Sequence, residues 1–185
     1  MKKSILKLSL TLVAAAVFLA SCKKDEGETN DEEIITTFIV KLTPPTGPIV
    51  EFKYDDPDGP GGNAATTQEI VVAPNTTYQV SFSLLNKTIT PSDITQEIID
   101  EKNDHQFYIT KSGGVNLTIN NLSTDSNNFP FGQTSTWITG ALSTGKVVIV
   151  LKHKPGIKGA NDPVILGDTD IDTDEAFGGF LITIQ

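Results

Sequence analysis

The sequence predicts an all-β domain, a Greek-key, immunoglobulin-like sandwich of about eight or nine strands with one short helix. Apolar and β-branched runs recur between clusters of Gly, Pro, Asn and Asp, a pattern typical of short strands joined by turns. The clearest run is 77–86, where apolar side chains alternate with polar ones from Tyr78 to Leu84. Such alternation indicates a strand with one face in the core and one face in water.

The other expected strands follow the same logic in chain order. Residues 34–42 alternate and end at a turn containing three prolines, and residues 68–73 end at Pro74, because proline cannot continue a strand ladder. Later runs rich in Val, Ile, Thr and aromatic residues are bounded by Gly, Asn or Asp. The full set of expected strands is 34–42, 49–54, 68–73, 77–86, 105–111, 115–122, 134–140, 146–153 and 180–185.

One helix is expected between these strands. Thr90 offers a capping hydroxyl, Pro91 suits a first helical position, and Ile94 and Ile98 are spaced to share one face. These features predict one or two helical turns that end near Lys102 and pack over one end of the sandwich.

The amino terminus has the pattern of a secretory signal. Residues 1–21 combine a Lys-containing start with a short apolar stretch, too short to be expected as a permanent transmembrane helix. The sequence Leu19-Ala20-Ser21-Cys22 resembles the bacterial lipobox, in which the Cys receives a diacylglyceryl group after cleavage. Cys22 is the only Cys in the chain, so we expect lipidation; the alternative is an ordinary signal peptide with an incidental Cys.

Residues 22–33 are expected to be an acidic tether between the lipidated Cys22 and a single domain, 34–185. Removing residues 1–21 takes away three Lys and no acid, so the net charge falls from -9 to -12. Lys24-Asp25-Glu26 resembles the surface-export signal of Bacteroidota lipoproteins. We therefore expect a protein anchored in the outer membrane, and leave open whether it faces the cell surface or the periplasm.

Composition excludes one class of partner and argues against catalysis. All 14 basic residues are Lys and the pI is about 4.6, so the chain lacks the Arg fork used on phosphates and bases and would be repelled by nucleic acid. The sequence has no nucleophile elbow, no His-Glu-x-x-His motif and no phosphate loop. We expect a protein that is not an enzyme and has no obligatory cofactor.

Two acidic segments are candidate Ca²⁺ sites. Asp56 and Asp58 are two residues apart before a Gly, and Asp168, Asp170 and Asp172 continue that spacing in a second segment. Clustered carboxylate oxygens are the ligands that Ca²⁺ prefers. In an extended strand the second set would share one face and repel without a cation. The favoured alternatives are an ordinary Asp-Pro-Asp-Gly turn and a wet, charged edge strand.

The two histidines are a weaker candidate for a Zn²⁺ or Cu²⁺ site. His105 and His153 each lie at the end of an expected strand, and together with Asp104 or Glu101 they would form a site if those strands are adjacent. The alternative is two unrelated histidines with surface or structural roles.

The chain resembles a family of small flavobacterial lipoproteins over nearly its whole mature length. The resemblance is carried by the lipobox with its acidic tether and by five short segments, 33–37, 56–59, 104–107, 151–155 and 167–171. Members often carry the label "type 1 periplasmic binding fold superfamily", and the family has no assigned function. That label implies two parallel α/β lobes, whereas the strand pattern here predicts a sandwich.

Three functions are consistent with these features. The leading hypothesis is a lipid-anchored, non-enzymatic sandwich that binds a small ligand or assists an outer-membrane uptake receptor. The second is a structural or adhesive domain with protein partners. The third is metal capture, which requires the histidines to converge. A pocket with aromatic walls would favour the first and a broad exposed apolar face the second.

Overall fold

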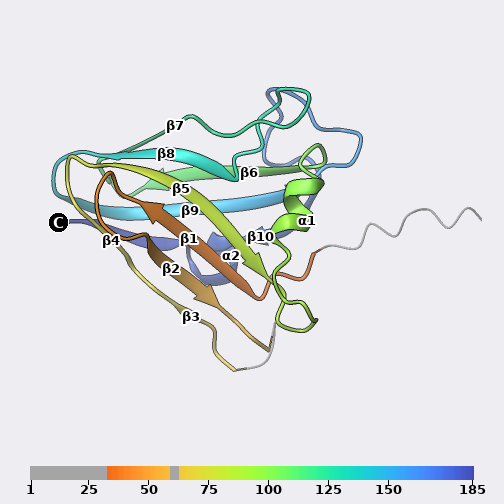
Figure 1. Ribbon diagram of the computed structural model, residues 1–185, viewed down its shortest axis with the longest axis horizontal. Helices are drawn as coiled ribbons and strands as arrows, with labels where there is room; N and C mark the ends of the chain where they lie inside the picture. Colours follow the sequence, from red (N-terminus) through yellow and green to blue (C-terminus); the bar gives the residue numbers. More distant parts are fainter. Residues whose placement is uncertain (1–32, 59–62) are drawn as a thin grey trace, which may run out of the picture. The chain divides into compact units, whose positions relative to one another are not determined.

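Eleven strands in two sheets and two short helices make up the protein over residues 33–58 and 63–185, which the computed structural model describes (Figure 1). The strands are β1 (Thr37–Thr43), β2 (Val50–Asp55), β3 (Thr66–Thr67), β4 (Ile70–Val72), β5 (Thr77–Leu85), β6 (His105–Ser112), β7 (Leu117–Asn120), β8 (Thr134–Thr139), β9 (Ser143–His153), β10 (Asp168–Asp172) and β11 (Phe180–Ile184). The helices are α1 (Thr95–Asp100) and α2 (Thr173–Phe177). The all-β sandwich expected from the sequence is confirmed.

The first sheet has the strand order β3-β2-β1-β5-β8-β7, and the second contains β6, β9, β10, β11 and β4. Strand β9 is the centre of the second sheet: β6 pairs along one side of it, and β10 and β11 share the other side. The chain passes repeatedly from one sheet to the other, as in Greek-key sandwiches. The only parallel pair among the strands of the described residues is β11 with β4.

Aromatic rings from both sheets meet in the core. Phe38 and Phe82 of the first sheet lie with ring centres 5.2 Å apart, and Phe107 of the second sheet lies 5.3 Å from Phe82. All three are fully or almost fully buried. The alternation in β5 holds as predicted, since Tyr78, Val80, Phe82 and Leu84 are all buried.

Several local expectations need correction. Ile34 is not part of β1 and is 55% exposed. Helix α1 begins at Thr95 rather than near Pro91, and the carboxylate of Asp93 accepts the backbone N–H of Thr95. Strand β3 and helix α2 were not expected, because short irregular elements carry little periodic signal. Strand β10 corresponds to the charged edge strand given as an alternative for the second acidic segment.

Helix α2 explains part of the second acidic segment. The Asp172 side chain accepts backbone N–H groups of Asp174 and Glu175 at the start of the helix, and Gly178 ends it in the left-handed conformation. These are standard capping roles for Asp and Gly. Within residues 33–58 and 63–185, no helix has the length and apolar character needed to span a bilayer. The predicted signal peptide, Cys22 and all of the tether except Glu33 lie outside the described residues.

Candidate metal centre

The two histidines face each other across a strand pair. His105 begins β6 and His153 ends β9, and the antiparallel register places them directly opposite. Directly opposed residues project from the same face of a sheet, so the two imidazole rings stack with centres 4.6 Å apart and an 8° angle between their planes. The convergence that the third hypothesis required is therefore present, although the separation of 48 positions in the sequence gave no indication of it.

A β-bulge brings Asp170 to the histidines. The pairing of β10 with β9 shifts between Thr169 and Ile171, so Asp170 is the extra residue with no partner in the ladder. A bulge redirects the side chain of the residue it contains. As a result, the Asp170 side chain is fully buried even though the next residue, Ile171, is buried too. The second acidic segment does not share one face as expected, because the bulge and the start of α2 break its alternation.

Glu33 completes the cluster from the other sheet. It lies four residues before β1, the strand that belongs to the first sheet, and its side chain is only 12% exposed. The sequence had placed Glu33 at the end of a solvated tether. It sits in an acidic run with no apolar periodicity, so no pattern in the sequence distinguished it from its neighbours.

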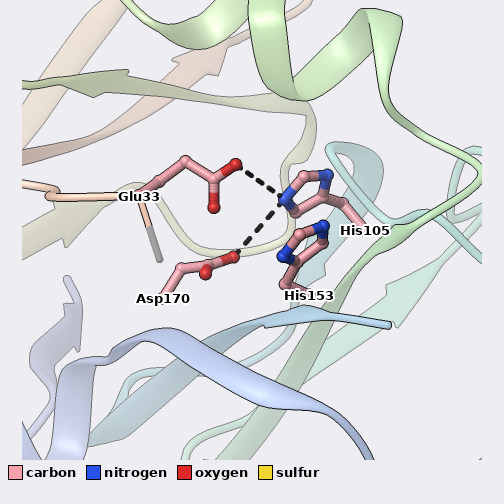
Figure 2. Close-up of side chains that lie close together, drawn as sticks. All are labelled: Glu33, His105, His153 and Asp170. Atoms are coloured by element: carbon pink, nitrogen blue, oxygen red, sulfur yellow. Dashed lines mark ion pairs between the residues drawn. The ribbon is translucent and has the colours of Figure 1, made fainter. Parts of the chain in front are cut away.

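The four side chains point into one small volume, drawn in Figure 2. Nε2 of His105 lies 3.3 Å from Oε1 of Glu33 and 3.5 Å from Oδ2 of Asp170. One ligand atom from each of the four residues can be chosen so that all lie within 4.8 Å of one another. Ligand atoms bound at 2.0–2.2 Å to a tetrahedral ion are about 3.3–3.6 Å apart. The distances from Nε2 of His105 to the Glu33 and Asp170 oxygens lie in this range.

The hydrogen bonding of His105 directs its free nitrogen into the cluster. Nδ1 lies 3.2 Å from the backbone carbonyl oxygen of Glu101, which can only accept, so we assign the ring hydrogen to Nδ1. Nε2 then presents a lone pair to two carboxylate oxygens. That arrangement is repulsive unless a cation, a proton or a metal ion, lies among them.

Without a metal ion, protons supply the positive charge between the His105 nitrogen and the two carboxylates. Burial by itself would lower the pKa of His105, but hydrogen bonding to Glu33 and the negative charges of Glu33 and Asp170 raise it. Burial would raise the pKa of Glu33, and interaction with His105 lowers it overall. Burial and the charge of Glu33 raise the pKa of Asp170 to about 8. The cluster therefore holds protons that a metal ion would displace.

The other acidic candidates do not belong to this group of four ligands. Asp58 accepts hydrogen bonds from the backbone and side-chain nitrogens of Asn63, and Asp56 accepts from the Tyr54 hydroxyl at 3.4 Å. Asp168 is exposed at the start of β10, and Asp172 caps α2. Glu33, His105, His153 and Asp170 form the one group of three or more such ligands found in the described part of the chain. A Ca²⁺ site at the acidic segments stays a prediction.

The surface hollows offer little for stacking a sugar or another planar ligand. A hollow of about 550 Å³ over the second sheet is lined by Glu69, Lys146, Thr183 and neighbours without any aromatic residue. An adjoining hollow of about 330 Å³ has Phe177 in its wall. Trp137 is fully buried. Phe177 is therefore the one aromatic side chain in the walls of these two hollows, which gives weak support for a small organic ligand.

No protein family model matches the chain, and neither the curated proteins nor the solved structures include one that is detectably similar. The function must therefore be argued from the site.

Proposed function

We propose that this protein is a lipid-anchored, non-enzymatic sandwich that binds one divalent transition-metal ion, Zn²⁺ or Cu²⁺, through Glu33, His105, His153 and Asp170. The observation that carries the proposal is that buried polar atoms without a hydrogen-bond partner gather in this cluster. Seven buried side-chain nitrogen or oxygen atoms of the described residues have no hydrogen-bond partner, and five of them belong to these four residues. Buried polar atoms are normally paired, so their gathering in one place supports a missing cation.

The charges of the site suit a divalent ion. Two ionised carboxylates carry two negative charges and two neutral imidazoles carry none, so an ion of charge +2 makes the buried centre neutral. Burying a neutral assembly avoids the large desolvation cost of an unpaired charge. The Nδ1 contact of His105 with the Glu101 carbonyl is also the kind of outer interaction that orients metal-binding histidines.

The ligand types narrow the choice of ion. Two imidazole nitrogens and two carboxylate oxygens suit Zn²⁺ and Cu²⁺, whereas Ca²⁺ takes six to eight oxygens and Cu⁺ prefers sulfur. Four protein ligands fill a tetrahedral ion, while catalytic zinc sites keep one position for water or substrate. The set therefore favours holding an ion over performing chemistry on a substrate.

In this proposal, the metal ion is the small ligand that the lipid-anchored outer-membrane protein binds. Capture of a scarce ion and its delivery to a neighbouring uptake receptor is consistent with such a location, and a purely structural ion is the other outcome of binding.

The experiment compares two Asp→Asn variants of the full chain after chelator treatment. Asp170→Asn removes a ligand, and Asp174→Asn makes the same charge change four residues later at an exposed position. We expect the native chain and Asp174→Asn to bind one Zn²⁺ in calorimetric titration. Asp170→Asn should bind at least about a hundredfold more weakly, since even outer-shell changes at metal sites cost 10–100-fold.

Co²⁺ and Cu²⁺ supply the spectroscopic control. Co²⁺ should give the visible bands of a tetrahedral centre, and Cu²⁺ should show coupling to two imidazole nitrogens in electron paramagnetic resonance, reduced to coupling to one nitrogen in His105→Gln. Equal Zn²⁺ affinity of the two Asn variants, or no binding by the native chain, would refute the metal site and leave a proton-sharing ion cluster.

A further inference from the structure

The loop between β9 and β10 carries a group of exposed apolar side chains. Ile165 is 82% exposed and Ile157 is 54% exposed, and Val164 and Leu166, on either side of Ile165 in the chain, are exposed as well. The N–H of Leu166 donates to the carbonyl of Pro163, so Val164 and Ile165 occupy the corner of a tight turn. Turn corners normally carry Gly, Asn, Asp or Ser, and exposed apolar clusters mark interaction sites.

Buried polar contacts hold this loop in place. The ammonium group of Lys154 is fully buried and pairs with Asp162 at 2.8 Å. The Tyr108 hydroxyl donates to the backbone carbonyl of Asp162, and Lys152 donates to that of Gly167. Because these contacts already order the loop, its exposed apolar side chains would lose little conformational entropy on binding a partner.

The loop and the amino-terminal end of the domain lie at the same end of the sandwich. The loop starts after His153 and returns to Asp168, which pairs with His153 in the ladder. Glu33 lies in the same cluster as His153. Figure 1 shows the loop, in blue, and the first described residues, in orange, at the right-hand end of the view.

We infer that Val164, Ile165 and their neighbours Ile157 and Leu166 form a second, shallow contact with the bilayer in which Cys22 is anchored. The inference rests on the predicted lipid anchor and not on the metal site. Eleven residues from Cys22 to Glu33 span at most about 40 Å, and β9 alone extends about 35 Å away from this end. The tether from Cys22 joins the domain at the end that carries the loop, so this end lies within reach of the bilayer, and apolar side chains insert favourably at a membrane surface.

The test uses the full lipidated chain with one added Cys. Because acylation blocks the Cys22 thiol, Ile165→Cys supplies the only free thiol, and Leu142→Cys supplies a matched control. Leu142 is 70% exposed and lies just before β9, at the opposite end of that strand from His153. Each variant carries an environment-sensitive fluorophore and is reconstituted into net-neutral phosphatidylcholine and phosphatidylethanolamine vesicles, since an acidic chain is repelled by anionic lipid.

We expect the label at position 165 to emit at shorter wavelength in vesicles than in detergent-free buffer and to be quenched by nitroxide-labelled lipid. The label at position 142 should show neither change. Equal exposure of both labels to an aqueous quencher would overturn the bilayer contact and point to a protein partner for the loop. Failure of the native chain to float with vesicles would refute the anchor and this inference with it.

Discussion

Buried charged side chains of this protein fall into two groups that differ in how their polar atoms are satisfied. Lys154 and Lys158 each have several partners: Lys158 lies 3.0 Å from Asp125 and donates to the carbonyl of Lys102. In the cluster of Glu33, His105, His153 and Asp170, no Lys is present, and Nε2 of His105 faces carboxylate oxygens of both Glu33 and Asp170. The first group is balanced by a Lys, whereas the second needs a proton or another cation between its carboxylates.

The Asp125–Lys158 pair is expected to contribute strongly to stability. Asp125→Asn would leave Lys158 buried without its carboxylate, and we expect a loss of about 3–5 kcal/mol in unfolding free energy at pH 7. Asp100→Asn, on the exposed surface of α1, should change it by less than about 0.5 kcal/mol. Urea denaturation measures both. Adding Lys158→Met to Asp125→Asn should restore most of the loss, because no unpaired charge remains.

The Asp125–Lys158 pair also predicts how the free energy of unfolding depends on pH. Burial would raise the pKa of Asp125, but the bond from Lys158 and the backbone N–H groups of Phe129 and Asn127 lower it below its ordinary value. A carboxyl with a lowered folded pKa adds stability above its unfolded pKa of about 3.9, and that stability is lost as the pH falls through the folded value. The native chain and Asp125→Asn should therefore converge in stability below about pH 4. A constant difference down to pH 2 would contradict this.

At the scale of elements, the junction of β9 and β10 determines the geometry of the proposed metal site. The bulge at Asp170 turns one carboxylate inward, and Gly167 lets the loop return close to β9 with φ at +81°. A Cβ at Gly167 would press against the backbone carbonyl of His153, closer than van der Waals contact allows. Gly156, in the same loop, has φ at +68° but open space around it.

These two glycines form a matched pair for mutation. Both Gly→Ala changes incur the left-handed backbone cost of about 1–2 kcal/mol. Only Gly167→Ala should also push β10 away from β9, so we expect it to lower stability further and to weaken Zn²⁺ binding. Thermal unfolding and Zn²⁺ titration of both variants test this. Similar affinities in the two variants would show that the site does not depend on the close approach of the strands.

At the scale of the whole molecule, a bound ion would join the two sheets, because Glu33 leads into the first and the other three ligands belong to the second. Zn²⁺ at a hundred times its dissociation constant should add about 2.7 kcal/mol of stability, raising the melting temperature by about 5–10 °C for a domain of this size. Ca²⁺, and NaCl at matched ionic strength, should not reproduce this. A Ca²⁺-specific shift abolished by Asp58→Asn would instead support a calcium site at the first acidic segment.

Membrane attachment is expected to depend on a single residue. Cys22→Ala removes the acylated side chain, and with it about 0.8 kcal/mol of membrane affinity for each buried methylene. We expect the variant to leave the membrane fraction. Fractionation of cells that express the native and variant chains measures the effect, with Ser21→Ala as a control that keeps the thiol. Unchanged fractionation of Cys22→Ala would contradict lipidation as the anchor.

The fold class and most strands could be predicted from the sequence, because alternating apolar residues have to face a core whatever the strands pair with. Chemical type also made His105 and His153 candidates for a Zn²⁺ or Cu²⁺ site and Asp170 one of several candidates for a Ca²⁺ site. The boundaries of α1 and the existence of α2 were not predictable at that level, since helices of five or six residues have too few turns to show a period.

Only the tertiary structure decided which candidate ligands meet. Strand register, which depends on long-range packing, set His105 opposite His153. A one-residue bulge turned Asp170 inward, and the packing of the two sheets brought Glu33 to the same point. A residue's chemical type is local and is written in the sequence, whereas the separation between distant residues is a property of the whole packed core. Three of the four proposed ligands could therefore be named as candidates from the sequence, but Glu33 and the assembly of the four into one site could not.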